Sequence, residues 1–457
     1  MVLKKGILSV LGANVISLIF NLLTSFLLPK YLSVDVYATI KTFQLYVVYI
    51  GLLHLGYADG MYLRYGGVSA SKIEKEKLVE DIATMRLFQI IISLITVSVC
   101  LFIHDNVWLA FAISVVPLNM ASYYKLLCQA TGEFTEYGRV MNATTIVTFL
   151  LNMILLFVFR QRDSSYFYIA AYVLVYIAIW LYSEYIIKKT FHLSRLSGHC
   201  SFSVLKHNVV DGILLMLGNL STAFLTGMDR WFVKYLMNTL AFAQYSFAVS
   251  IENFLNVAVT PVSVTLYNYF CINHRKEELE KIKGLIYVLA VGLPACAFPA
   301  KWILEHFLQK YIDSASVLFL LFAAQMFAII VKCLYINLYK VFRKQRRYFL
   351  KLTGVIVAGF IFNVVCYMLL HSKEAFALGT LASNMLWFVI SSFDFKSLKP
   401  SLKEGVYLFL EVLIFLLCGY YLNSIIGFFA YAVISVILTR ILMKQTVVYG
   451  LEIFKKR

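Results

Sequence analysis

The chain alternates between long apolar runs and short polar segments along its whole length. About fourteen runs of roughly 20 residues lie between clusters of charged residues, at approximately 7–29, 38–61, 84–103, 107–128, 139–159, 166–187, 209–228, 240–263, 284–304, 315–338, 349–370, 375–393, 405–422 and 425–443. A helix needs about 20 apolar residues to cross the hydrocarbon core of a bilayer. The pattern predicts an all-α polytopic membrane protein of about 14 transmembrane helices, with short connections.

The seventh and eighth runs each carry polar residues on one helical face. Asp211, Asn219, Thr222, Thr226 and Arg230 recur at intervals of 8, 3, 4 and 4, and Gln244, Glu252, Asn256, Thr260 and Ser263 at intervals of 8, 4, 4 and 3. Such intervals follow the helical period. A carboxylate in an apolar run costs several kcal/mol unless it faces water or a partner. Glu252, with Asn253 and Asn256, is therefore predicted to line a hydrated cavity.

The first two runs show the same property. The first carries Asn14, Ser17, Asn21 and Ser25 at intervals of 3, 4 and 4, and the second carries Lys41, Gln44, Gly51 and Asp59 on one approximate face. Polar groups within a bilayer must be satisfied by protein or by water. We expect runs 1, 2, 7 and 8 to face one another across a central, partly hydrated cleft.

Other interpretations of these polar residues stay open. Asn, Ser and Thr also hold transmembrane helices together, at about 0.6 kcal/mol per contact, and we prefer that interpretation for the fifth and twelfth runs. Lys41 either faces the cleft or extends its ammonium to the interface, which is the expectation for Lys332. Asp229 and Arg230 are expected to pair at the end of the seventh run, and a gating ion pair is the weaker alternative.

Composition agrees with a membrane protein and excludes several other classes. Hydrophobic residues make up 61% of the 457 residues and charged residues 14%, against about 25% charged residues in soluble domains. The eight cysteines are dispersed without zinc or redox spacing, and the histidines are scattered. No P-loop, His-Glu-x-x-His or Gly-x-Ser-x-Gly motif occurs. We expect no metal, no cofactor and no enzymatic activity.

The basic residues are distributed unevenly between the two sides of the predicted helices. The side that holds both termini receives 31 of the 41 Lys and Arg residues, the opposite side receives eight, and Lys41 and Lys332 lie within runs. The positive-inside rule then predicts that both termini are cytoplasmic. The net charge of +17 orients the chain and contacts anionic lipid head groups, so it indicates no nucleic-acid partner.

A weak internal repeat divides the chain. The tripeptide Lys30-Tyr31-Leu32 recurs as Lys234-Tyr235-Leu236, each time between an odd and an even run. The two copies run in the same direction, which predicts a parallel repeat about an axis along the membrane normal. The expected organisation is two six-helix lobes, residues 1–190 and 191–395, followed by two further helices and a cytoplasmic tail in residues 396–457.

Two segments resemble the polysaccharide-transporter branch (O-antigen and capsule flippases) of the multidrug/oligosaccharidyl-lipid/polysaccharide exporter superfamily. One comprises residues 28–32, Tyr37 and residues 55–64; the other is Asp229-Arg230 followed by residues 245–249. Val36 stands before Tyr37, where the family often has glycine. The resemblance implies two six-helix lobes around a cleft lined by spans 1, 2, 7 and 8. It also implies cationic residues in that cleft, for which Lys41 and then Arg64 are the candidates.

The function that the resemblance implies is alternating-access transport of a polyprenyl-diphosphate-linked oligosaccharide across a bacterial cytoplasmic membrane. Its partners would be the lipid-linked substrate, membrane lipids and other proteins of polysaccharide assembly such as a polymerase. A drug/cation antiporter of the same superfamily is the first alternative; it would favour more acidic residues, and Glu252 is the only clear acid expected in mid-membrane. A glycan polymerase or ligase is the second, but the predicted loops are too short for the large catalytic loop such enzymes carry.

Overall fold

The chain folds entirely into helices in the part that the structure describes. The computed structural model describes residues 2–272 and 275–455, with side chains for all of these except 2–14, 268, 271–272, 345 and 450–455. No strand occurs in these ranges, and each of the expected apolar runs falls on helical segments, although several of them, including the second and the eighth, are divided between two or more helices. Twelve helical segments are long and apolar enough to cross a membrane, and α1 contributes a shorter apolar stretch, Val15–Tyr31. The prediction of an all-α polytopic membrane protein is confirmed.

The chain divides into two compact units, Met1–Ala223 (unit 1) and Phe224–Arg457 (unit 2). Unit 1 contains α1 (Val2–Tyr31), α2 (Val34–Val47), α3 (Tyr57–Tyr65), α4 (Lys75–Ile103), α5 (Asn106–Thr131), α6 (Phe134–Met153), α7 (Ser165–Thr190) and nearly all of α8 (Phe202–Leu225). Unit 2 contains α9 (Met228–Leu236), α10 (Thr239–Glu252), α11 (Leu255–Ile272), α12 (Lys276–Gly292), α13 (Ala297–Phe307), α14 (Ser314–Ile330), α15 (Ile336–Val341), α16 (Gln345–Leu370), α17 (Lys373–Phe393), α18 (Leu402–Tyr421), α19 (Ser424–Leu442) and α20 (Lys444–Lys455). The lobe boundaries expected from the repeat, after residues 190 and 395, stay a prediction.

Side-chain caps explain where several of these helices begin. The Asn238 side chain accepts a hydrogen bond from the backbone amide of Ala241 (2.8 Å) at the start of α10, and Asn423 accepts one from Ile426 (2.8 Å) at the start of α19. Ser401 and Glu404 form a reciprocal capping box at the start of α18. Caps of this kind satisfy backbone donors that a helix leaves unpaired in its first turn.

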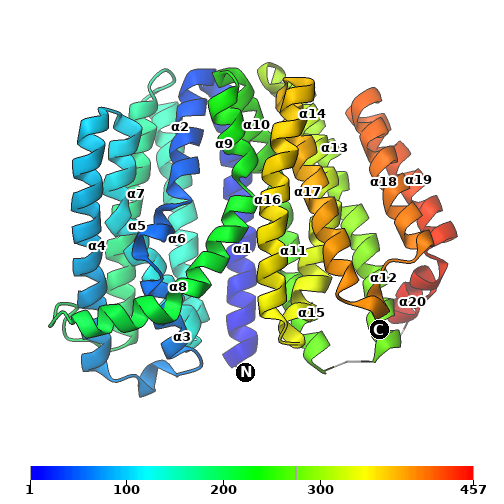
Figure 1. The fold of residues 1–457 in the computed structure, drawn as a ribbon. Coiled ribbons are helices and arrows are strands. Elements are labelled where there is room, and N and C mark those ends of the chain that lie inside the picture. Colours follow the sequence, from blue (N-terminus) through cyan, green and yellow to red (C-terminus); the bar gives the residue numbers. More distant parts are fainter. Residues whose placement is uncertain (1, 273–274, 456–457) are drawn as a thin grey trace. The chain divides into compact units, whose positions relative to one another are not determined.

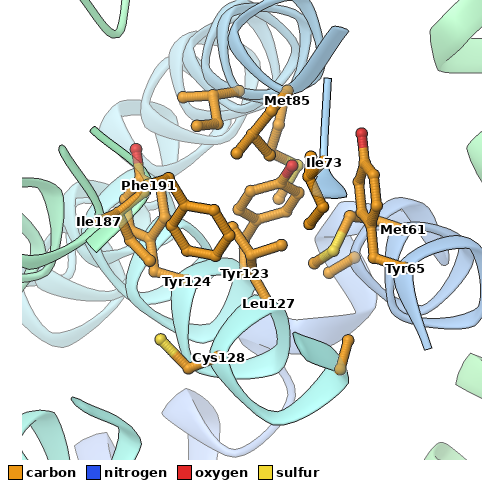
Figure 2. Close-up of a cluster of buried hydrophobic side chains, with 14 of the residues drawn as sticks. Met61, Tyr65, Ile73, Met85, Tyr123, Tyr124, Leu127, Cys128, Ile187 and Phe191 are labelled. Carbon is orange, nitrogen blue, oxygen red and sulfur yellow. The ribbon is translucent and has the colours of Figure 1, made fainter. Parts of the chain in front are cut away.

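The core of unit 1 is built around tyrosines on α3 and α5. Figure 2 shows Tyr123, Tyr124 and Leu127 of α5 between Met61 and Tyr65 of α3 and side chains of α4 and α7. The ring centroids of Tyr123 and Tyr124 lie 5.6 Å apart in an edge-to-face arrangement. In the same unit α4, α5 and α7 stand side by side, and α1 packs along α6 (Figure 1).

The outward side of α4 is apolar. Leu94 is 63% exposed and Phe102 is 84% exposed. A soluble protein would not display a helix of this kind, whereas lipid tails surround such side chains at little cost. The exposed face of α4 is therefore a lipid-facing surface.

Unit 2 is organised around α14. Every residue from Val317 to Val331 is buried, and α14 packs against α10, α12, α17 and α18. Its continuation is η6 (Val331–Tyr335), a short π-helical segment that joins α14 to α15. A helix that is buried on all sides is apolar all round, which explains why α14 shows no amphipathic pattern.

The last two long helices, α18 and α19, form a hairpin in unit 2 (Figure 1). Its aromatic residues Phe415 and Tyr431 pack on Phe298 of α13, with ring centroids 5.7 and 5.8 Å away. The ammonium of Lys301 donates to the backbone carbonyls of Gly419 (2.7 Å) and Leu422 (2.6 Å). The hairpin is thus an integral part of unit 2.

Candidate substrate-binding sites

The second apolar run is a broken helix in unit 1. After α2 ends at Val47, the chain passes through η1 (Ile50–His54) and a left-handed turn at Leu55 (φ 50°) and Gly56 (φ 85°) before α3 begins. A positive φ at position 56 favours glycine. The backbone N–H of Gly56 donates to Nδ1 of the His54 ring (3.1 Å). The single continuous span that the sequence predicts over 38–61 is therefore wrong in its detail.

Side chains from two neighbouring helices satisfy the backbone of this break. Nδ2 of Asn119 on α5 donates to the carbonyl of Ile50 (3.2 Å), and Nε2 of Gln89 on α4 donates to the carbonyl of Leu53 (3.3 Å). Asn119 also donates to Gln89 Oε1 (2.7 Å). Irregular backbone at membrane depth is tolerated when protein groups replace the lost helical hydrogen bonds.

Asp59 lies just beyond the break and meets Asn219 of α8. Nδ2 of Asn219 donates to Oδ1 of Asp59 (3.2 Å), and Nε2 of His54 lies 3.8 Å from Oδ2 of Asp59. Asp59 is only 5% exposed. The structure thus brings together two of the residues that the polar pattern selected, Asp59 and Asn219.

Glycines allow α8 to approach α3 closely enough for this contact. A Cβ atom on Gly60 would lie 2.0 Å from the carbonyl oxygen of Asn208, and one on Gly212 would lie 2.0 Å from the carbonyl oxygen of Gly56. Neither position has room for a side chain. Small residues that let transmembrane backbones come together are a common packing device in bilayers.

A polar cavity of about 360 Å³ opens beside the break. It is lined by the break itself, by α5, by the start of α6 and by the second half of α8, and its polar side chains are those of Tyr49, His54, Asp59, Ser122, Lys125, Gln129, Tyr137 and Asn219. Sequence reasoning missed Lys125, because it lies near the end of the fourth run and was counted with the basic residues of the cytoplasmic side. The signal that could have found it was a lysine in the second half of an otherwise apolar helix.

Arg64, a predicted cleft residue, is held by an ion pair in unit 1. Its guanidinium donates from Nη1 to both carboxylate oxygens of Asp81 (3.2 Å each) and from Nη2 to the side chain of Asn208. Asp81 is fully buried, and Oδ2 also accepts a hydrogen bond from the Tyr65 hydroxyl (2.5 Å). This geometry gives Arg64 a structural role between α3, α4 and α8; its predicted contact with substrate stays a prediction.

Lys41 and Gln44 lie together on α2, facing α7. The Lys41 ammonium donates to Gln44 Oε1 (3.1 Å) and lies 5.3 Å from the centroid of the Tyr37 ring. Gln44 Nε2 donates to the hydroxyl of Tyr172 (2.9 Å). Two further candidates lie on α1: Asn21 is exposed, and Asn14 lies outside the residues whose side chains the structure describes.

The eighth apolar run is also broken, and Glu252 lies at its break in unit 2. α10 ends at Glu252, and α11 begins at Leu255. Between the two helices, backbone hydrogen bonds reach three residues back instead of four. The N–H of Asn256 donates to the carbonyl of Asn253 (3.1 Å), and the N–H of Val257 donates to the carbonyl of Phe254 (3.1 Å). Discontinuous helices of this type often form the binding sites of transporters.

The break packs against the π-helical segment of the tenth run. Gln325 of α14 donates its side-chain amide to Glu252 Oε1, and Lys332 of η6 donates its ammonium to Asn256 Oδ1 (3.0 Å). Asn256 in turn donates to Asn253 Oδ1 (3.4 Å). Single π-helical turns occur often at functional sites. Lys332 was expected to extend to the interface; instead its ammonium donates to Asn256, which in turn donates to Asn253, while Glu252 is held separately by Gln325.

The expected side-chain pairing of Asp229 with Arg230 does not occur among the described residues. Asp229 Oδ2 accepts hydrogen bonds from the hydroxyls of Tyr245 (2.6 Å) and Thr380 (3.3 Å), and Oδ1 accepts the backbone N–H of Arg230 (2.7 Å). Consecutive residues of a helix point in different directions, so their side chains do not face each other. Asp229 therefore joins α9, α10 and α17, and a gating role for the two residues stays a prediction.

The structure adds one acidic residue that the sequence reasoning overlooked. Glu411 of α18 is fully buried; Oε1 accepts a hydrogen bond from Ser435 (3.1 Å), and Oε2 has no partner among the described groups. The statement that Glu252 is the only clear acid within the membrane is therefore wrong. Glu411 was missed because it interrupts a strongly apolar run without a polar stripe around it.

A second cavity, of about 540 Å³, lies in unit 2 between three connecting turns. Its polar lining comprises Asn238, Gln244, Asp313, Ser316, His371, Ser372, Lys373 and Glu374. Two contacts cross it: Lys373 donates to Gln244 Oε1, and Ser316 donates to Glu374 Oε1 (2.6 Å). No group of three or more potential metal ligands lies together in the described part of the chain.

Comparison with known proteins gives matches in structure alone. No family model matches the sequence, and no curated protein matches it. A solved structure of the lipid II flippase MurJ in an inward closed conformation superposes with a TM-score of 0.64 at 11% identity, covering 97% of this chain and all of that one. The eukaryotic MATE transporter AtDTX14 superposes with a TM-score of 0.56 at 14% identity, covering 90% of this chain and 99% of that one.

This chain has the fold of these transporters. The likeness extends over nearly the whole chain in both cases. Identities of 11% and 14% are too low to transfer a substrate or a residue's role, so the comparison establishes the fold and leaves the function to be argued from the sites.

Proposed function

We propose that the protein is an alternating-access flippase. It moves a polyprenyl-diphosphate-linked oligosaccharide from the inner to the outer leaflet of a bacterial cytoplasmic membrane, with both termini cytoplasmic. It acts without cofactor or enzymatic chemistry and serves surface polysaccharide assembly, with the lipid-linked substrate, membrane lipids and a polymerase as partners.

One observation carries this proposal: the second and eighth runs, which are equivalent in the predicted parallel repeat, are both broken beside a carboxylate. Asp59 follows the break in unit 1, and Glu252 precedes the break in unit 2. A continuous helix satisfies its own backbone, so irregular backbone in the membrane occurs where it is buried in protein or lines a cavity, and discontinuous helices often form the binding sites of transporters. Two such breaks in a chain with a lipid flippase's fold support a pair of polar walls for a large hydrophilic head group.

The predicted substrate residues divide between these walls. Asp59 and Asn219 belong to unit 1, as do Lys41 and Gln44, and Glu252, Asn253 and Asn256 belong to unit 2. A glycan needs many hydrogen-bond donors and acceptors, which amides and carboxylates supply. The lipid tail can stay in the bilayer throughout.

The proposal is tested with a deletion strain complemented by variants. Glu252→Gln and Lys41→Ala, produced at wild-type protein levels, are expected to lower the amount of surface glycan, because each removes a charge from a predicted wall. Glu76→Gln and Lys75→Ala, at exposed positions at the start of α4, serve as the matched controls for loss of one charge. Full surface glycan in both charge variants removes Glu252 and Lys41 from the mechanism.

A drug/cation antiporter is the second candidate function. The fold is shared with a MATE transporter, and the buried acids Asp59, Asp229 and Glu411, with the half-buried Glu252, supply the carboxylates that a proton- or Na⁺-coupled antiporter uses. Its test is a drug-efflux assay with an imposed proton or Na⁺ gradient. Gradient-dependent efflux that is lost in Glu252→Gln, with unchanged surface glycan, favours the antiporter.

A further inference from the structure

Lys125 lines the unit 1 cavity, and no carboxylate of the described residues forms an ion pair with it. Lys125 lies on α5, is half-buried and lines the cavity together with Ser122 and Gln129 of the same helix. Among the described residues, no hydrogen bond or ion pair reaches its ammonium. An ammonium withdrawn from water is costly unless a charge or several hydrogen bonds compensate it.

Asp59, the acidic residue in the described lining, is already engaged elsewhere. It lies in the crossing of α3 and α8, where Asn219 donates to Oδ1 and the His54 ring lies near Oδ2. Two arginines of this unit differ from Lys125, since Arg64 is paired with Asp81 and Arg86 with Glu184 (2.6 Å). The cavity thus contains one positive charge that a ligand could neutralise.

The rest of the lining suits a polyhydroxylated anion. Amide and hydroxyl groups of Gln129, Asn219, Ser122 and Tyr137 surround the cavity, and each can donate or accept a hydrogen bond. The volume of about 360 Å³ lies within the range of cavities that hold small ligands. The lysine ammonium is a compact point charge with rotatable donors, so it can pair with either a carboxylate or a phosphate.

We propose that this cavity is a binding site for an anionic substituent, a carboxylate or a phosphate group, with Lys125 as its counter-charge. The site lies within unit 1, beside the break of the second run, and its lining does not include Lys41. The inference rests on the proposed transport of a lipid-linked glycan for its choice of ligand, because a sugar carboxylate and a carrier phosphate are the two sources of such a group.

The experiment measures binding to the purified full chain at constant ionic strength. The probes are inorganic diphosphate for the phosphate source, glucuronate for the sugar source and glucose as the uncharged control. Wild type is compared with Lys125→Met, Lys125→Arg and Lys206→Met, the last being an exposed lysine of α8 in the same unit. Thermal unfolding without ligand first verifies that each variant is folded.

We expect one anionic probe to stabilise wild type, Lys125→Arg and Lys206→Met, while glucose has no effect. Lys125→Met is expected to bind that probe roughly tenfold more weakly or worse, because a hydrogen bond to a charged group is lost. The probe that binds identifies the source of the anion. Equal anion binding by Lys125→Met and wild type, or no binding of either anion by wild type, overturns the proposal.

Failure of this proposal is distinguishable from failure of the proposed function. Equal binding by Lys125→Met, with surface glycan still dependent on the protein, removes the anion site and leaves the flippase. Anion binding that requires Lys125, with surface glycan unchanged in the deletion strain, leaves the site and removes the transport role.

Discussion

The side-chain amide of Asn219 donates a hydrogen bond to the buried carboxylate of Asp59, 160 residues earlier in the sequence. The contact joins α8 to the short helix α3 that follows the break of the second run. It places two residues from separate polar stripes at one wall of a polar cavity. Four predictions follow from this and related contacts.

Asn219→Leu is expected to destabilise the protein. The change leaves Oδ1 of Asp59 without its donor in a site where water is scarce, which costs about 1–3 kcal/mol of unfolding free energy. Thermal unfolding of the purified protein measures the effect. Asn21→Leu, on an exposed position of α1, controls for loss of an amide and is expected to unfold like wild type. A melting temperature of Asn219→Leu equal to that of wild type contradicts this prediction.

Gly212→Ala is expected to separate α8 from α3. The added methyl group would lie 2.0 Å from the carbonyl oxygen of Gly56 and 2.3 Å from the amide nitrogen of Gly60, both of which are backbone atoms that cannot rotate away. Overpacking of this kind costs about 1–3 kcal/mol or more. Gly218→Ala, two turns further along α8, meets no atom within 4 Å and is the matched control. Similar stability of the two variants would show that the close crossing is absent.

Lys332→Met and Asn256→Ala are expected to reduce transport by similar factors, because each removes the same hydrogen bond between η6 and α11. A hydrogen bond to a charged group accounts for roughly tenfold in an equilibrium. The double variant should be no worse than the more impaired single variant, since coupled residues are not additive. Surface glycan at matched protein levels is the measurement. Multiplicative effects of the two changes would mean that the residues act independently.

Asp394→Asn is expected to change the dependence of stability on pH. Burial alone would raise the pKa of Asp394, but the Lys351 ammonium (2.8 Å) and the Tyr339 hydroxyl (2.6 Å) hold it below its usual value. A lowered pKa in the folded state stabilises the protein above the unfolded-state pKa of about 4, and this stabilisation is lost as the pH falls through the folded-state pKa.

The difference in melting temperature between wild type and Asp394→Asn should therefore be full at neutral pH and shrink in acid. Asp313→Asn, which changes an exposed acidic residue in the turn before α14, is the comparison. A difference that stays constant from neutral to acid pH would assign the effect to packing rather than to charge.

The apolar pattern was sufficient to predict the helices, because the bilayer imposes their length. Every expected run falls on helical segments, and the spacing that selected Glu252 and Asn256 places them on the two sides of the break between α10 and α11. The positions of the two breaks could not be predicted in the same way. They depend on donors such as Asn119 and Gln89, which lie on other helices and reach the exposed carbonyls only in the fold.

Charged residues were harder to assign than helices, because their roles depend on partners far away in the sequence. Arg64, a predicted cleft residue, contacts Asp81 and Asn208, which lie 17 and 144 residues away in the sequence. Lys125 was counted with the basic residues of the cytoplasmic side, although it lines a cavity. Glu411 lacks a polar stripe, so the spacing rule that found Glu252 could not find it.

The central claim is tested most directly with purified protein reconstituted into liposomes that contain the lipid-linked oligosaccharide of the producing strain. An impermeant glycosidase added outside cleaves only glycan that reaches the outer leaflet, so the cleaved fraction is the quantity measured. The account predicts that this fraction rises from roughly half to nearly all with wild-type protein, and that Glu252→Gln slows the rise. A fraction that stays at roughly half with folded wild-type protein would contradict the flippase.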